Sequence, residues 1–318
     1  MAAEQQKNTG GARTSGRRFF YGGQAVMEGV MIRGQRFACV AVRRPDGQIA
    51  TNVEPLSAAY TGPVRRIPLV RGLIVLVETL VLGTKSLMYS ANVALEQEGG
   101  EMGRWSTGLM VAASLAFTIV VFFMLPLLFV RLLDNVFQAG AAGDIMSNLV
   151  EGVVRLGLFL AYVWGIGFMR DIRRVFAYHG AEHMAVKAFE ANEPLDVDHV
   201  RKHTTAHPRC GTAFLLVVMV VAILVFAFLG RPEIVWRILS RIILVPVIAG
   251  VAYEVIRFSG AHQSNPVVRL VVAPSLMLQA LTTRKPDDSQ IEVAIHAMET
   301  ALAADEGREP GKPQETEG

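Results

Sequence analysis

Long apolar stretches alternate with polar, basic ones along the chain, and this pattern predicts a membrane protein. The clearest stretch covers residues 109–130. A helix of that length, rising about 1.5 Å per residue, would cross about 30 Å of hydrocarbon. The composition agrees, because 52% of the 318 residues are hydrophobic and only 19% are charged. The four spans expected from the pattern are residues 109–130, 149–169, 213–229 and 234–253.

Two further apolar stretches are interrupted by charges or proline. Residues 69–88 contain Arg71, Glu78 and Lys85, and residues 267–281 are broken by an arginine and a proline. Such segments are poor candidates for full spans, because charged groups are costly in hydrocarbon. We therefore expect interfacial or re-entrant helices there, with long basic side chains reaching the headgroups.

The segments outside the membrane have patterns of their own. Extended, β-branched residues at 37–44 and 48–53 flank Pro45-Asp46-Gly47, which is typical of a β-hairpin. Near the C-terminal end, apolar residues recur at helical spacing, so an amphipathic helix is expected at 286–304. The predicted fold class is an all-α integral membrane bundle of about four transmembrane helices, with interfacial or re-entrant helices and a small N-terminal β-hairpin region.

Five regions follow from these patterns. They are a disordered basic N-terminus (1–18), a cytoplasmic β-hairpin region (19–66), a membrane domain with a loop at 170–211 (67–285), the amphipathic helix (286–304) and a disordered tail (305–318).

Lysine and arginine predict how the chain is oriented. They are frequent before the first span and between the second and third, whereas the two opposite loops carry little beyond Arg131 and Arg231. The positive-inside rule therefore places both termini and the 170–211 loop in the cytoplasm. A net charge of only +3 does not call for a nucleic-acid partner. Cys39 and Cys210 form no disulfide framework.

The strongest chemical motif is the hexapeptide at 178–183, which reads H-x-x-E-H from His179 to His183. Residues four apart lie on one face of a helix, so the two imidazoles could bind one metal ion. Glu182 falls on the same side and could act as a general base. The alternative is an exposed polar helix with two hydrogen-bonded histidines.

Other candidate ligands are expected at the same membrane face. His207 and Cys210 precede the third span, and Glu254 lies at the cytoplasmic end of the fourth. Imidazole, thiolate and carboxylate all bind zinc, and a catalytic zinc keeps three protein ligands. The sequence leaves open which of these three residues would complete the site. For His207 and Cys210 the alternative is a turn that leads into a helix.

Three more residues are candidates for supporting roles. Arg209 and Arg257 could hold an anionic substrate group or a lipid headgroup. Glu28 lies in a largely apolar stretch and would need a partner if buried. It could hydrogen-bond a residue that binds the metal, or it could be a plain surface carboxylate. His203 is more simply explained as a solvated loop histidine.

The chain resembles the YqhQ-like family, which are bacterial membrane proteins with a domain of unknown function. The matching stretches are 22–34, 178–183, 207–212, 253–258 and 278–295, in order and over nearly the whole chain. Members are described as predicted metal-dependent enzymes. The resemblance therefore implies such an enzyme in the bacterial inner membrane, but supplies no substrate. The motif positions are Glu28, His179, Glu182, His183, His207, Arg209, Cys210, Glu254 and Arg257.

Two functional hypotheses follow. The first is a membrane-embedded zinc hydrolase with its site at the cytoplasmic interface, acting on membrane-associated peptides or lipids. The second is a non-enzymatic membrane scaffold or regulator, in which the same polar cluster binds a structural metal or forms a hydrogen-bond network. A transporter is disfavoured, because no expected span has a buried ionisable residue near its midpoint.

Overall fold

The computed structural model describes residues 21–57, 62, 67–95, 104–133, 141–207, 210–230, 232–262 and 265–308. The tail expected at 1–18 lies outside these residues, as does the C-terminal tail from residue 309 onwards. The chain is mostly helical, with four apolar helices and a small antiparallel sheet near the N-terminus.

The sheet is a meander of four antiparallel strands in the order β1-β2-β3-β4. The expected hairpin is present as β3 (Phe37–Arg43) and β4 (Ile49–Pro55), with Gly47 at φ 87° in the turn. It is preceded by a second hairpin of β1 (Gly22–Val26) and β2 (Gly29–Arg33), which the sequence did not predict. The glycines near the ends of these short strands gave the segment the composition of a loop. The turn between the strands has a residue with a positive φ of 52°, and that residue is Glu28 rather than a glycine.

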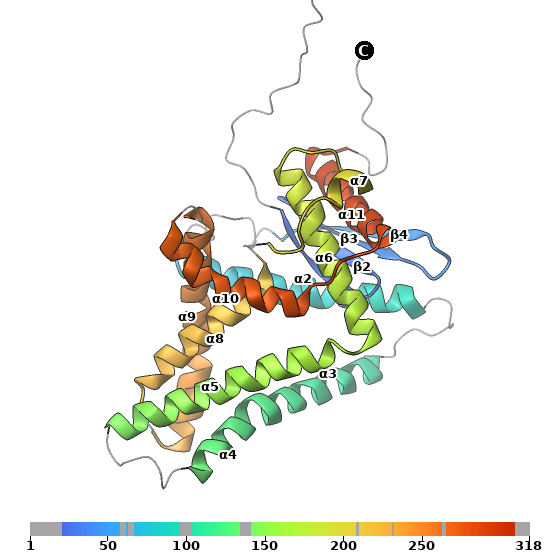
Figure 1. The fold of residues 1–318 in the computed structure, drawn as a ribbon. Helices are drawn as coiled ribbons and strands as arrows, with labels where there is room; N and C mark the ends of the chain where they lie inside the picture. Colours follow the sequence, from blue (N-terminus) through green and yellow to red (C-terminus); the bar gives the residue numbers. More distant parts are fainter. Residues whose placement is uncertain are drawn as a thin grey trace, which may run out of the picture.

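Helices cover both faces of this sheet (Figure 1). One face packs against α6 (Arg170–Glu190) and α11 (Asp288–Glu306), and the other against α2 (Val70–Leu95). The strand residues alternate between the two cores, as the pleat requires. On the α6–α11 side they include Val30, Ile32, Cys39 and Ala41; on the α2 side they include Met31, Val40 and Val42.

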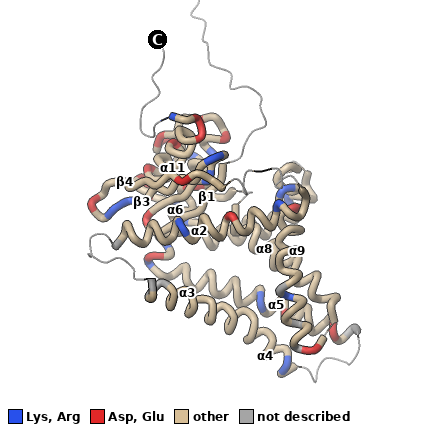
Figure 2. The backbone as a smooth tube through the Cα atoms, turned by 180° about the vertical axis from the view of Figure 1, so that it is seen from behind, with Lys and Arg blue, Asp and Glu red and all other residues tan. Residues whose placement is uncertain are grey.

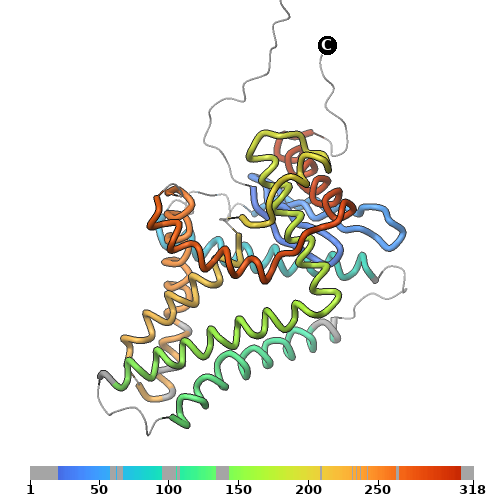
Figure 3. Tube along the Cα trace, in the orientation of Figure 1, coloured from blue at the N-terminus to red at the C-terminus, as the bar shows by residue number. Residues whose placement is uncertain are grey.

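The amphipathic helix expected at 286–304 is α11, and its apolar stripe is packed into the first core. It starts with a capping box between Asp287 and Gln290 and ends at Gly307, which has the left-handed conformation typical of a helix C-terminus. Strands from the start of the chain thus lie beside a helix from its end (Figure 3). We call β1–β4, α6 and α11 the sheet module.

The apolar helices form the rest of the molecule. α3 (Arg104–Ile119), the π-helical turn η3 (Val120–Met124) and α4 (Leu125–Leu132) are continuous. They are followed by α5 (Ala141–Ile166), and later by α8 (Gly211–Ala227), α9 (Ile234–Ala261) and α10 (Pro266–Thr282). Between α6 and α8 lies the single turn of α7 (Val197–Val200).

Within the described residues, four stretches are long and apolar enough to cross a membrane: Val70–Ala94, Gly108–Leu132, Gly143–Ile166 and Ile238–Ala261. Three of them match expected spans. The fourth is α2, where the sequence favoured an interfacial or re-entrant helix because of its charges. The remaining expected span, 213–229, corresponds to α8, which has only 17 residues. Length and composition alone therefore do not decide between α2 and α8.

The inference that no expected span has a buried ionisable residue near its midpoint was wrong. Residue 155 is in the middle of α5, and Arg155 there donates to Glu151, which is 3% exposed. Arg241 of α9 donates to the same Glu151 oxygen at 2.7 Å, and Arg155 also donates to the carbonyl of Phe122 in η3. The apolar helices therefore do enclose ionisable residues. The sequence analysis missed this because it started the span at residue 149, eight residues after α5 begins.

Candidate metal centre

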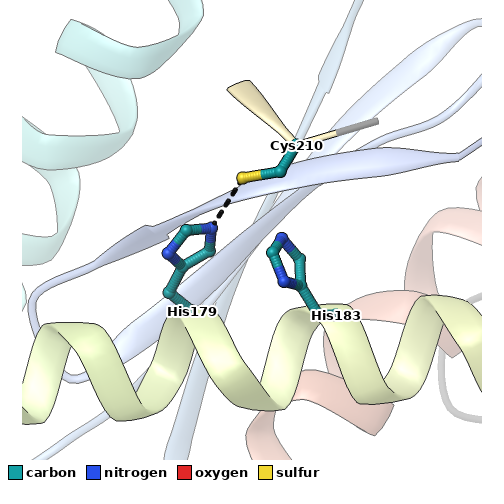
Figure 4. Close-up of side chains that lie close together, drawn as sticks. All are labelled: His179, His183 and Cys210. Atoms are coloured by element: carbon teal, nitrogen blue, oxygen red, sulfur yellow. Dashed lines mark hydrogen bonds between the residues drawn. The ribbon is translucent and has the colours of Figure 1, made fainter. Parts of the chain in front are cut away.

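His179 and His183 project from the same face of α6 towards the start of α8 (Figure 4). Their ring centroids are 4.4 Å apart. Cys210, the residue immediately before α8, faces them, and its Sγ lies 3.1 Å from Nε2 of His179. One ligand atom from each of the three residues lies within 4.8 Å of the other two. Side chains distant in the sequence thus converge on one point.

The backbone fixes the orientation of both imidazoles. Nδ1 of His179 lies 2.9 Å from the carbonyl oxygen of Thr282, and Nδ1 of His183 lies 2.5 Å from that of Thr205. A carbonyl oxygen only accepts hydrogen bonds, so each Nδ1 carries the proton and donates it. The lone pair of each ring is then on Nε2, which is the arrangement found in many metal-binding histidines.

Cys210 is placed by the helix that it precedes. Its extended backbone and its Sγ, which accepts a hydrogen bond from the backbone N–H of Thr212, make it the N-cap of α8. The thiolate is the form of cysteine that binds metals. The set of two imidazoles and one thiolate suits zinc.

Glu182 is buried, with 4% of its surface exposed, between α6 and the first strand. The backbone N–H of Gly23 donates to its carboxylate, whereas Oε2 has no hydrogen-bond partner within the described part of the chain. Burial raises the pKa of this carboxyl to about 7, against the opposing effects of His179 and Gly23. Such a group can accept and release a proton near neutral pH.

Gly23 makes this arrangement possible. A Cβ at this position would lie 2.1 Å from the carbonyl oxygen of Met31 and 3.2 Å from Cδ of Glu182. Any side chain here would therefore clash with the backbone of β2, the neighbouring strand, and would crowd Glu182 of α6.

His207 lies beside the trio of His179, His183 and Cys210 rather than within it. Its ring centroid is 5.4 Å from that of His183, and its Nε2 is 3.6 Å from a carboxylate oxygen of Glu190. Its backbone N–H donates to Oε1 of Gln279 at 2.8 Å, and Nε2 of Gln279 donates back to the His207 carbonyl at 2.7 Å. This reciprocal pair holds α10 over the site. Sequence reasoning missed Gln279, although a lone amide in an apolar helix is a signal of a buried partner.

Glu254 lies outside the trio of His179, His183 and Cys210. Its carboxylate accepts two hydrogen bonds from the guanidinium of Arg71 and one from the backbone N–H of Leu69. The geometry therefore favours Cys210 as the third ligand among the alternatives that the sequence left open. Arg257, three residues further along α9, is exposed. Arg209 lies outside the described residues.

Glu28 anchors the start of α6. Its two carboxylate oxygens accept hydrogen bonds from Nε and Nη2 of Arg174, both at 2.5 Å, and the hydroxyl of Tyr178 donates to it at 3.3 Å. Burial, followed by the charge of Glu28, raises the pKa of Tyr178 above its usual value. Tyr178 directly precedes His179, so Glu28 fixes the register of α6 on the sheet.

Comparisons with known proteins identify relatives but no activity. Residues 67–304 match the model of a family described as "Protein of unknown function (DUF1385)". The chain is 33% identical over 296 residues to the uncharacterized protein YqhQ of Bacillus subtilis (strain 168), covering 89% of this chain and 92% of that protein. No solved structure gives a significant match.

Proposed function

The chain belongs to the DUF1385 family of proteins of unknown function, and from that premise we propose that it is a zinc-dependent hydrolase embedded in the bacterial inner membrane. The single observation that carries the proposal is the convergence of His179, His183 and Cys210, with both Nδ1 protons directed away from the common point.

The three side chains fit zinc by donor type, and each is held in place by the backbone. A zinc ion, when bound, would supply Lewis-acid activation of water and of a substrate carbonyl or phosphoryl oxygen. The chain contributes Glu182, whose buried Oε2 has no partner among the described residues and can take up a proton. The reciprocal hydrogen bonds of Gln279 fix the C-terminal part of α10 beside the site.

The substrate class follows from the position of Cys210. This residue caps the helix that begins the second pair of apolar helices, so the site lies where the sheet module meets them. A site at that depth would suit a lipid or a membrane-associated peptide. We place it at the cytoplasmic face, with both termini in the cytoplasm, because of the distribution of lysine and arginine.

The alternative is a structural metal site in a non-enzymatic scaffold. His183 and Cys210 are buried, and the trio joins α6 to α8, as a structural zinc would. In that case the ion would stabilise the junction without meeting a substrate.

Elemental analysis of the purified protein tests the proposal. We expect stoichiometric zinc in the wild type and its loss in His179→Ala and Cys210→Ala, whereas His203→Ala, outside the trio, keeps it. Wild-type protein without stoichiometric metal would refute the hydrolase.

The Glu182→Gln variant then distinguishes the zinc hydrolase from the scaffold with a structural metal site. The amide is similar in size to the carboxyl but cannot act as a base. Retained zinc and fold together with lost function, in cells that depend on the protein, would support the enzyme. Retained function would favour the scaffold.

A further inference from the structure

α2 is long and apolar enough to cross a membrane, yet its charges are arranged for another role. Arg71, Glu78 and Lys85 are seven residues apart and so lie along one stripe of the helix. Each has an acidic or basic partner on a different element. The pairs are Arg71 with Glu254 of α9, Glu78 with Arg33 of β2, and Lys85 with Glu54 of β4.

The same side of α2 packs along the sheet. Leu82 and Val93 belong to the core that covers the second sheet face, and Glu78 is buried. A Cβ on Gly83 would lie 2.5 Å from Oε1 of Gln24 in β1. Contacts thus extend from residue 78 to residue 93, more than half of the helix, so α2 runs beside the sheet rather than away from it.

The way the chain returns to the sheet limits how often it can cross the bilayer. α6 packs on β1 and β2, so it lies on the same side of the membrane as the strands. Between β4 and α6 the chain contains α2, α3–α4 and α5. The number of crossings among them must be even. α3–α4 and α5 supply two, and a third by α2 would leave α6 on the wrong side.

We infer that α2 does not cross the bilayer but lies in the plane of its surface, with the sheet on one side and lipid on the other. The inference rests on the membrane placement proposed above and is independent of zinc or catalysis. We infer contact with lipid at the headgroup–hydrocarbon boundary because the outer face of α2 is apolar and exposed. That face comprises Leu73, Val77, Leu80, Val81 and Leu87.

Contact with α9 brings α2 to the level of the bilayer. A Cβ on Gly72 would lie 2.8 Å from Cα of Gly250, so the two helices touch, and Arg71 pairs with Glu254 nearby. Because α9 is one of the apolar helices, lipid that surrounds it reaches α2 as well.

The same counting applies to the second half of the chain. α6 and α11 lie on one sheet, so crossings between them must also be even. α9 supplies one, and α8, which has no charged residue in its 17 positions, supplies the other. At about 1.5 Å per residue it is about 26 Å long, close to the thickness of the hydrocarbon. Asn148 of α5 donates to the carbonyl of Gly230, which places the α8–α9 turn beside the start of α5, on the far side.

Labelling of single cysteines with a membrane-impermeant maleimide tests the inference in the full-length protein in spheroplasts. The added cysteines are Ile67→Cys and Asn92→Cys, at the two ends of α2, and Glu233→Cys in the α8–α9 turn. The wild-type cysteines are buried and give the background. We expect both ends of α2 to react only after permeabilisation and Glu233→Cys to react before it. Ends of α2 that react from opposite sides would overturn the inference.

Nitroxide labels measure depth. At Leu73, Val77 and Leu87 we expect similar, shallow depths and labels that are more accessible to oxygen than to an aqueous nickel complex. At Lys85, on the sheet side, we expect the label to be more accessible to the nickel complex than to oxygen. Greater accessibility to nickel on the outer face, or a depth maximum at Val77 that indicates a re-entrant helix, would overturn it. Glu233→Cys and the zinc content of the same samples report separately on the proposed topology and the proposed function.

Discussion

The sheet module and the apolar helices solve the burial problem in opposite ways. In the module the apolar side chains are inside, as for Met298 at 0% exposure. Charged residues are frequent along the module and sparse along α3 (Figure 2). In the helices the outward residues are apolar, as for Leu109 at 73% exposure, and charge is enclosed, as for Glu151. The two parts thus bury opposite kinds of side chain. The histidines of the candidate metal centre belong to the sheet module, and its cysteine belongs to the apolar helices.

The largest expected effect comes from the enclosed charge. Glu151→Leu leaves Arg155 and Arg241 without their shared carboxylate, which should cost about 3–5 kcal/mol of unfolding free energy. Thermal or denaturant unfolding of the protein in detergent measures this. Asp198→Asn, at an exposed site in α7 and outside the apolar helices, should change stability by less than about 0.5 kcal/mol. Equal effects would mean that the helices do not depend on enclosed charge.

A matched pair of methionines tests the opposite burial directly. Met298→Ala empties a fully buried position and should cost about 2–5 kcal/mol. Met277→Ala removes a side chain of α10 that is 73% exposed and should cost much less in a detergent micelle. The comparison would fail if the two unfolding free energies changed alike.

A matched pair of glycines tests the contact between β1 and α6. Gly23→Ala places a methyl group against the Met31 carbonyl and Glu182, so we expect a loss of about 1–3 kcal/mol and reduced zinc content. At Gly22 a Cβ meets nothing within 4 Å, and Gly22→Ala should be tolerated. A stable Gly23→Ala protein with full zinc content would show that the close approach is dispensable.

The smallest effect concerns pH. Burial lowers the pKa of His296, whose Nε2 lies 2.9 Å from Oγ1 of Thr51. The unfolded chain then binds a proton more readily than the folded one, so His296 reduces stability as pH falls from 6.5 through the folded pKa. His296→Gln should remove that part of the pH dependence and leave stability at pH 7.5 almost unchanged. An unaltered slope between pH 7 and pH 5.5 would contradict this.

The sequence predicted what local patterns encode. Residues four apart on a helix sufficed for His179 and His183, Pro45-Asp46-Gly47 for one hairpin, and the helical spacing of apolar residues for the last helix. Apolar length found most of the long helices. These features depend on neighbours within a few residues, which a single sequence displays.

Long-range pairing could not be predicted in the same way. Glu254 was a reasonable ligand until its partner was found at Arg71, 183 positions earlier. Both Gln279 and Gly23 owe their roles to backbone that reaches them from elsewhere in the chain. The charges of α2 predicted an interfacial or re-entrant helix, but the choice of an in-plane helix rests on its contacts with the sheet and on the return of α6 to β1, which a single sequence does not display.

In the membrane placement proposed above, the shortness of α8 would make the junction sensitive to its lipid environment. Its 17 residues span less than an average bilayer core, so a thicker membrane stretches the mismatch and a thinner one relieves it. Cys210 moves with the end of α8, whereas the imidazoles are fixed to α6 and the sheet. Tilting α8 would therefore change the distance between the thiol and the imidazoles, so at the proposed metal site membrane thickness would affect how tightly the three side chains hold an ion.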